Sequence, residues 1–143
     1  MTRQTAWAPT GSLGTGSFQW RVSTLDTSNN VIATTDWRGY TVDATAPTIL
    51  KRKPEGSGIK PTSTFTITFS EKVQGVSGKT IKLMLGKKVV KAKVKLNKSG
   101  TKVTLKPKKR LLRGKAYTLK IKDGITDTAG LPLAPSTYPF TIP

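Results

Sequence analysis

A pair of carboxylates in one short segment is the first feature of this sequence that could do chemistry. Asp123 and Asp127 flank Gly124-Ile125-Thr126, and two carboxylates at this spacing could contribute to a calcium site. Calcium takes about six to eight oxygen ligands, whereas this segment supplies only two carboxylates within a strongly basic part of the chain. Asx side chains in turns instead cap nearby backbone N–H groups, which is the interpretation that we favour. No metal is predicted.

Enzymatic chemistry has little support in the remaining residues. The 143-residue chain contains no cysteine and no histidine, which removes disulfides, thiolate and imidazole metal ligands, and every nucleophile–histidine arrangement. Glu71 lies beside Lys72 without a second carboxylate nearby in the sequence, as catalysis by paired acids would need. No Gly-rich phosphate loop or serine nucleophile motif is present. We therefore predict a protein that is not an enzyme and needs no cofactor.

Lysine is the most abundant charged residue, and its distribution is uneven. The chain has 25 Lys and Arg against 7 Asp and Glu, a net charge of +18. Residues 1–50 contain three arginines and three aspartates, which leaves 22 basic against 4 acidic residues in 51–143. A field of this sign attracts polyanions over long distances.

Strands place many of these lysines on exposed faces. Residues 88–96, KVVKAKVKL, alternate apolar residues with lysines. Because successive side chains of a strand point to opposite faces, such a strand has one apolar and one cationic face. The lysines with outward parity in their predicted strands are Lys82, Lys91, Lys93, Lys95, Lys102, Lys106, Lys120 and Lys122.

Two interpretations of the lysine faces stay open. Lysine on exposed strands prevents sheets from associating with one another, so the charge could serve solubility alone. Alternatively, the lysines contact an anionic polymer such as a teichoic or teichuronic acid, an acidic polysaccharide, or nucleic acid. The aromatic residues of this half have apparent core positions, so we expect no platform for stacking bases and no sequence-specific nucleic-acid recognition. No apolar run reaches the ~18–20 residues of a membrane helix, so membrane insertion is not predicted.

Regular turn signals predict an all-β, Ig-like β-sandwich of about seven strands after residue 47. No stretch has helical periodicity over three turns. The predicted strands are residues 48–54, 64–69, 81–85, 90–96, 103–105, 117–121 and 138–142.

One tyrosine has a spacing typical of such sandwiches. Tyr117 lies three residues after Gly114 and five after Leu112. This spacing fits a tyrosine corner, in which the hydroxyl bonds back to the backbone of the crossover. We predict a structural role for these three residues.

The first third of the chain has too few strands for a sandwich of its own. Residues 1–46 contain three strand-like segments, Thr5–Pro9, Phe18–Leu25 and a segment around Trp37–Val42. They also hold the three tryptophans, Trp7, Trp20 and Trp37. These tryptophans could form a glycan platform, but the favoured interpretation is that they are core residues of a domain whose earlier half is missing.

Two resemblances add to this interpretation. The first covers about a third of the chain, which resembles the closing strands of a fibronectin-III/Ig-like repeat with its Val-Asp-x-Thr-Ala-Pro linker. It implies that Met1 is a fragment boundary. The residues that carry it are Leu13, Gly16, Phe18, Trp20, Arg21, Val22, Asp26, Asn30 and Tyr40–Pro47.

The second resemblance covers nearly all of residues 48–143, which are similar to the bacterial Ig-like domain of S-layer and other surface proteins. The family's usual Ala-Gly-Asn is here Ala129-Gly130-Leu131, which puts a polar turn contact in doubt. The matching segments, in order, are Pro61, Phe65–Val73, Val103–Pro107, Leu112, Gly114, Tyr117–Leu119, Gly124-Ile125, Asp127, Ala129-Gly130, Leu133-Ala134 and Phe140–Ile142.

This second resemblance implies an extracellular, non-enzymatic spacer or adhesion module. Residues 1–46 would be an incomplete repeat plus linker, and residues 47–143 a complete sandwich. We expect a secreted or cell-surface location and a monomer. Its expected partners are neighbouring domains of the same chain and an anionic cell-wall polymer or acidic polysaccharide. The alternative function is a carbohydrate-binding or accessory module, itself non-catalytic, of an exported hydrolase.

Overall fold

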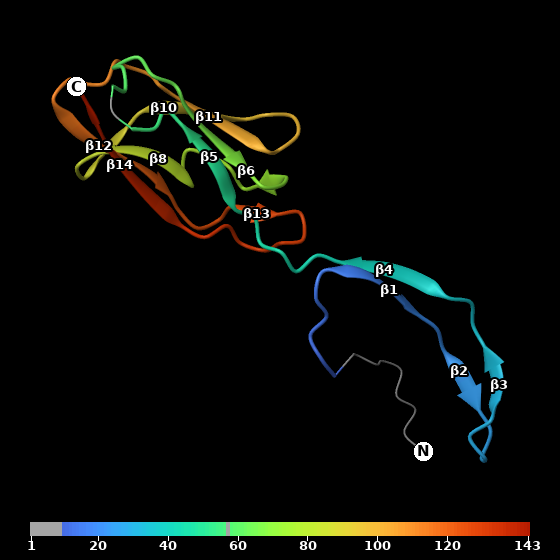
Figure 1. Cartoon of the computed structure of the whole chain (residues 1–143). Helices are drawn as coiled ribbons and strands as arrows, with labels where there is room; N and C mark the ends of the chain where they lie inside the picture. Colours follow the sequence, from blue (N-terminus) through green and yellow to red (C-terminus); the bar gives the residue numbers. More distant parts are fainter. Residues whose placement is uncertain (1–9, 57) are drawn as a thin grey trace. The chain divides into compact units, whose positions relative to one another are not determined.

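The computed structural model describes residues 10–56 and 58–143, which contain strands and no helices (Figure 1). The chain divides into two compact units, residues 1–45 and residues 46–143. The predicted strand Thr5–Pro9 and Trp7 lie outside the described residues. None of the described residues forms a helix long and apolar enough to cross a membrane. The all-β fold class predicted from turn spacing and alternation is confirmed.

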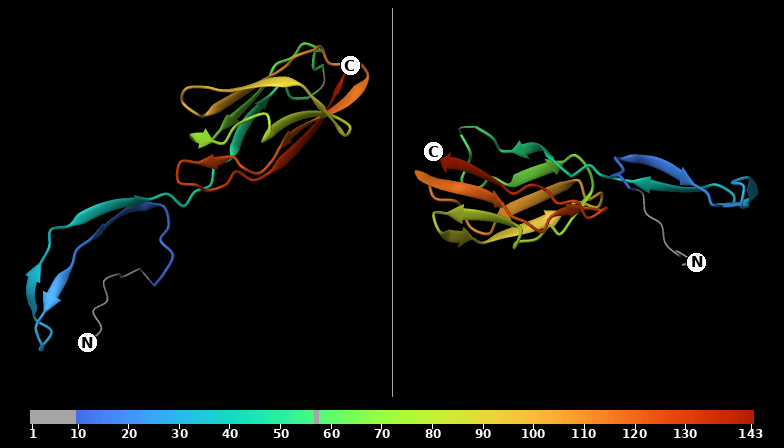
Figure 2. Two further views of the ribbon diagram at one scale, coloured as in Figure 1. Left: turned by 180° about the vertical axis from the view of Figure 1, so that it is seen from behind. Right: turned by 90° about the horizontal axis from the view of Figure 1, so that it is seen from below.

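The larger unit is a sandwich of two antiparallel sheets (Figures 1 and 2). The first sheet has the order β10-β11-β6-β5, and the second has the order β14-β12-β8-β9. The first comprises β5 (Ile49–Lys53), β6 (Phe65–Phe69), β10 (Ala92–Leu96) and β11 (Lys102–Pro107). The second comprises β8 (Ile81–Leu85), β9 (Lys88–Val90), β12 (Lys115–Ile121) and β14 (Ser136–Ile142), and a separate short pair joins β7 (Val73–Gln74) to β13 (Thr126–Asp127).

The core lies between the two sheets and follows the alternation of the sequence. Phe65, Ile67 and Phe69 of β6 are buried, whereas the threonines between them are half-buried on the other face. Four further core residues come from segments outside the strands: Ile59, Leu111, Ile125 and Leu133. Burying each such side chain contributes roughly 1.5–3 kcal/mol, an upper value that chain ordering largely offsets.

The segment 88–96 differs from the single strand predicted over residues 90–96. Its first part, β9, pairs with β8 in the second sheet, whereas β10 pairs with β11 in the first sheet. The chain changes sheets at Lys91, whose carbonyl accepts a hydrogen bond from the backbone N–H of Lys108 at 2.8 Å. Strands of a sandwich change sheets at such bends, and the alternation of half-buried and exposed residues continues across this one.

The smaller unit is a two-stranded ribbon in which none of the described residues is buried. Strand β1 (Gly16–Trp20) pairs with β4 (Arg38–Val42), and β2 (Ser23–Leu25) pairs with β3 (Val31–Thr34). The predicted strands did not include β3. The turn at its tip is closed by Asp26, whose carboxylate accepts hydrogen bonds from the backbone N–H groups of Ser28 and Asn30.

Candidate functional site

One outer face of the first sheet gathers most of its lysines. Cross-strand register places Lys93 opposite Lys106, and Lys95 opposite Thr104. Residues paired across antiparallel strands point to the same side of the sheet, so the register defines one shared face. We call this surface the lysine face; it consists of Lys51, Lys53, Lys93, Lys95, Lys102 and Lys106 around Thr66, Thr68 and Thr104.

The lysine face has no acidic neighbour within its own strands. None of β5, β6, β10 and β11 contains an aspartate or glutamate. All six lysines are exposed, and the three threonines between them are half-buried. Like charges directly opposite each other in a sheet are destabilising, so the pairing of Lys93 with Lys106 costs the fold some stability. An anion on this face would remove that repulsion.

The structure does not bring all eight predicted lysines together. Lys82 and Lys120 are cross-strand neighbours in the second sheet, on the opposite side of the sandwich. Lys122 follows β12 and donates its backbone N–H to the Thr80 carbonyl at 2.8 Å, while Lys91 lies where the chain changes sheets. The lysine face therefore keeps only Lys93, Lys95, Lys102 and Lys106 of the predicted set.

Two members of the lysine face, Lys51 and Lys53, were not among the predicted lysines. The signal was present, because Ile49–Lys53 reads ILKRK and its alternate lysines are exposed. What the sequence alone did not provide was the register that sets Lys51 opposite Thr68 and Lys53 opposite Thr66.

Tyr117 makes the contact that its spacing predicts. Its hydroxyl accepts a hydrogen bond from the backbone N–H of Leu112 at 2.8 Å, and its ring is buried. Gly114 has a φ of 67°, a left-handed conformation that glycine adopts without strain. Its backbone N–H donates to the Ile142 carbonyl at 2.7 Å. The crossover is thus tied to both β12 and the end of β14.

The two aspartates differ in environment. Asp123 is exposed, whereas Asp127 is fully buried. The Oδ1 atom of Asp127 accepts a hydrogen bond from the backbone N–H of Leu131 at 2.8 Å, which is the predicted turn capping. The donor is the backbone N–H of residue 131, so this polar turn contact is kept although leucine replaces the family's asparagine at that position.

A carboxylate near Asp127 does exist, but it comes from elsewhere in the sequence. Glu71, in the connection between β6 and β7, has an oxygen within 4.8 Å of an Asp127 carboxylate oxygen. Glu71 and Asp127 are far apart in the sequence, and the pairing of β7 with β13 brings them together. The sequence alone therefore did not reveal a second carboxylate near Glu71.

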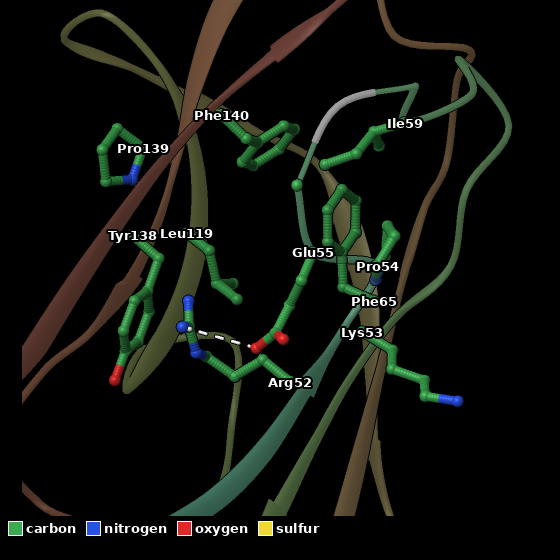
Figure 3. A pocket seen from close by; sticks show the side chains of 11 residues that line it. Arg52, Lys53, Pro54, Glu55, Ile59, Phe65, Leu119, Tyr138, Pro139 and Phe140 are labelled. Atoms are coloured by element: carbon green, nitrogen blue, oxygen red, sulfur yellow. Dashed lines mark ion pairs between the residues drawn. The ribbon is translucent and has the colours of Figure 1, made fainter.

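A cleft of about 280 Å³ opens between the edge strands β5 and β14 (Figure 3). The Arg52 guanidinium lies over the Tyr138 ring, 3.6 Å from its centroid, and pairs with Glu55 at 3.4 Å. The remaining lining is mainly aromatic, aliphatic and proline side chains, among them Phe65, Leu119 and Phe140. The guanidinium and the carboxylate pair with each other, so the described residues that line the cleft present no set of polar groups that converge on a ligand.

Two face-to-face antiparallel sheets, Greek-key strand order and a tyrosine corner define the larger unit as an immunoglobulin-like domain. The model of the bacterial Ig-like domain family matches residues 43–142, and the chain belongs to this family. The family and fold class expected from the sequence are thereby confirmed.

The solved structures to which the chain is similar include crystal structures of the S-layer protein SbsC. The N-terminal part of SbsC is 28% identical with a TM-score of 0.53, over 69% of this chain and 24% of that one. A structure spanning residues 31–844 of SbsC is 26% identical with a TM-score of 0.52, over 68% of this chain and 14% of that one. The chain thus matches about a quarter or less of each structure. No curated protein matches the sequence.

Proposed function

We propose that the chain is a non-catalytic module of a secreted or cell-surface bacterial protein, and that its lysine face binds anionic cell-wall polymers. The observation that carries polymer binding is the convergence of six lysines on one acid-free sheet face. The surface-protein module is supported by the family match and by the likeness to domains of an S-layer protein. The absence of histidine and cysteine from the chain agrees with a module that does no chemistry.

Neighbouring domains of the same chain are the second kind of partner in this proposal. The smaller unit supports such a partner, because its ribbon exposes 46% of Trp20 and 55% of Trp37. An isolated two-stranded ribbon is marginally stable in water, and large exposed apolar side chains favour coverage by further strands. We therefore interpret residues 1–46 as the closing part of a fibronectin-III/Ig-like repeat, and residues 47–143 as the complete Ig-like module.

The geometry of the lysine face favours a linear, phosphate-rich polymer. Adjacent strands lie about 4.8 Å apart and alternate residues about 6.6–7 Å apart, so the lysines leave the sheet backbone at regularly spaced positions. Lysine acts as a point charge without the geometric selectivity of arginine. Threonine hydroxyls in the middle of the face supply hydrogen-bond donors for phosphate or carboxylate oxygens. The face offers no aromatic ring for stacking bases, which disfavours nucleic-acid readout.

Co-sedimentation of the full chain with purified cell walls tests this proposal. Binding is expected at low salt and is expected to fall steeply as salt rises, because the Debye length shrinks from about 30 Å at 0.01 M to about 3 Å at 1 M. Walls from which the anionic polymers have been extracted should retain much less protein. Absence of retention at low salt would overturn polymer binding and leave the lysines with a role in solubility.

A charge-matched pair of variants separates the lysine face from net charge. One variant replaces Lys93, Lys95, Lys102 and Lys106 by glutamine. The control replaces Lys82, Lys115, Lys120 and Lys122 by glutamine; these lysines all belong to β8 or β12 or follow β12 directly. Both variants lose the same number of positive charges. If the lysine face is the binding surface, less of the first variant than of the second sediments with the cell walls; if only net charge matters, the two sediment equally.

The second candidate function is a carbohydrate-binding accessory module of an exported hydrolase. The exposed rings of Trp20 and Trp37 favour it, since aromatic platforms bind sugar rings. The Arg21 guanidinium lies 4.6 Å from the Trp37 ring centroid, which leaves Trp20 as the better platform. Affinity electrophoresis in gels that contain a neutral polysaccharide tests this function. Retardation of the unmodified chain that does not depend on salt, and that is lost in Trp20→Ala, would support carbohydrate binding.

A further inference from the structure

The outer face of β6 carries hydroxyl groups rather than charges. Thr66 and Thr68 of β6 lie on the lysine face, and cross-strand register sets Thr104 of β11 opposite Thr66. All three side chains are half-buried, and the described residues provide no hydrogen-bond partner for their hydroxyls. Such hydroxyls are free to donate to the oxygens of a bound anion. We call these three residues the threonine row.

Lysines border the threonine row on both sides. Adjacent strands lie about 4.8 Å apart, and lysine has a long, flexible stem, so an anion above β6 is within reach of ammonium groups from both neighbouring strands. Two of these lysines come from β5 and two from β11, and all four are exposed. They are Lys51 and Lys53 of β5, and Lys102 and Lys106 of β11.

A path across the strands meets fewer cations than a path along β6. Each cross-strand row of the lysine face contains two lysines, such as Lys53 and Lys95 in the row through Thr66. A path along β6 passes the four bordering lysines and the hydroxyls of the threonine row. Because each further ammonium group that a polyanion reaches releases more counterions and tightens binding, a polymer parallel to β6 is favoured.

A path along the β10–β11 pair also passes four lysines. There, however, Lys93 and Lys106 lie directly opposite each other, and only Thr104 supplies a hydroxyl. Hydrogen bonds to charged groups are stronger than those between neutral groups. The two hydroxyls of Thr66 and Thr68 therefore favour the path over β6.

We propose that an anionic wall polymer with a phosphodiester backbone lies along β6, on the threonine row and between the lysines of β5 and β11. This inference rests on the proposed function, and it adds the path of the polymer and the residues that hold it. The hydroxyls donate to phosphate oxygens, and the lysines neutralise the phosphate charge. Alternate residues of a strand are about 6.6–7 Å apart, so Thr66 and Thr68 contact separate groups of one polymer chain.

A labelled poly(glycerol phosphate) teichoic acid, titrated with the full chain and followed by fluorescence anisotropy at several salt concentrations, tests the threonine row. A double variant, Thr66→Val with Thr68→Val, keeps the charge and the branched shape of both side chains and removes only the hydroxyls. We expect its dissociation constant to rise about tenfold. The slope of log affinity against log salt should stay the same, because no charge is lost.

Thr118→Val is the matched control for the loss of a hydroxyl. Thr118 is half-buried in β12, a central strand of the second sheet, where its cross-strand partners are Met84 and Pro139. Valine is well accepted in strands, so this variant and the double variant should both keep the fold. Thr118→Val should bind the polymer as tightly as the unmodified chain.

A charge-matched pair of variants locates the path. β5 and β10 are the two edge strands of one sheet, and each carries two exposed lysines of the lysine face. Lys51→Gln with Lys53→Gln removes the lysines of the strand next to β6. Lys93→Gln with Lys95→Gln removes those of β10, which lies about 4.8 Å farther from β6. The β5 variant should lose severalfold more affinity than the β10 variant.

The outcomes separate this inference from the proposed function. No binding of the teichoic acid by the unmodified chain at low salt would overturn both. Binding that is equally tight in the unmodified chain and in the threonine double variant would overturn the role of the threonine row and leave polymer binding intact. Equal losses in the β5 and β10 variants, or a larger loss in the β10 variant, would overturn the path along β6. If the threonine double variant does not fold, the two lysine variants still decide the path.

Discussion

The hydroxyl of Tyr117 accepts the backbone N–H of Leu112 at 2.8 Å and closes the crossover that leads into β12. The Tyr117 ring is buried and stacks on Phe140 of β14, with 5.8 Å between ring centroids. This single side chain therefore joins a connecting segment, a central strand of the second sheet and its edge strand. The hydroxyl is the only part of it that phenylalanine lacks.

Tyr117→Phe is expected to destabilise the Ig-like unit by about 1–3 kcal/mol, because the Leu112 N–H loses its acceptor while the ring packing stays. Urea unfolding should show a lower midpoint with an unchanged slope. Tyr138→Phe is the control, since the described residues show no hydrogen bond to the Tyr138 hydroxyl. Equal midpoints for the two variants would contradict the role of the tyrosine corner.

Gly75→Ala should be among the most damaging single-methyl additions in the chain. Gly75 has a φ of +77°, and an added Cβ would overlap the carbonyl oxygen of Gly124. Strain and clash together should cost more than about 3 kcal/mol in the free energy of unfolding, measured in urea.

Gly86→Ala isolates the conformational part of this cost. At Gly86 φ is +56°, and nothing lies within 4 Å of the added Cβ. We expect this variant to lose about 1–2 kcal/mol. Similar losses for both variants would show that the β7 and β13 segments move apart easily.

The turn of the smaller unit should respond to acid. Hydrogen bonds from the side chain and backbone of Asn30, and then from the Ser28 backbone, hold the pKa of Asp26 below its ordinary value of 3.8. A lowered pKa in the folded state means that these bonds contribute stability above the unfolded pKa and lose it as pH falls through the folded pKa.

Nuclear magnetic resonance can follow this titration. The Asp26 carboxyl should titrate below 3.8, and the amide shifts of Ser28 and Asn30 should change with the same midpoint. Asn30→Ala should raise that midpoint toward the ordinary value, because it removes the largest stabilising contact. An Asp26 midpoint that Asn30→Ala leaves unchanged would show that the Asn30 side chain does not lower the pKa.

Much of the larger unit could be predicted because the alternation of apolar and polar residues that identifies each strand lies within that strand. Alternation identifies β6, where Phe65 and Phe69 face the core, and each strand carries its own pattern. The alternation in Lys88–Leu96 was also visible, but the change of sheets at Lys91 was not. That change depends on which partners β9 and β10 find, and no property of the segment itself specifies them.

The functional surfaces depend on pairing between distant segments, so they could be predicted only in part. Parity placed Lys93 and Lys106 outward, but only register made them neighbours and separated them from Lys82 and Lys120. The same holds for Glu71, whose proximity to Asp127 follows from the β7–β13 pair. Two-residue strands such as these carry too little pattern to be recognised.

Lys93 and Lys106 repel each other in the folded protein, so a substitution that removes this repulsion should stabilise the fold and at the same time weaken polymer binding by the lysine face. Lys93→Glu places opposite charges across β10 and β11, where a cross-strand pair contributes about 0.2–1 kcal/mol. We expect a stabilised fold at low salt and weaker co-sedimentation with anionic cell walls. Lys98→Glu makes the same charge change in the turn between these strands and serves as the control.

The two variants separate local pairing from net charge. If cross-strand pairing matters, Lys93→Glu gains more stability than Lys98→Glu, and the difference shrinks toward zero near 1 M salt, where the Debye length is about 3 Å. If both gain equally, only the overall charge is felt, and the register of the lysine face has no energetic consequence. Wall binding gives an independent test of the lysine face. If the face is the binding surface, Lys93→Glu loses more wall binding than Lys98→Glu. If the walls respond only to the overall positive charge, both variants lose wall binding equally.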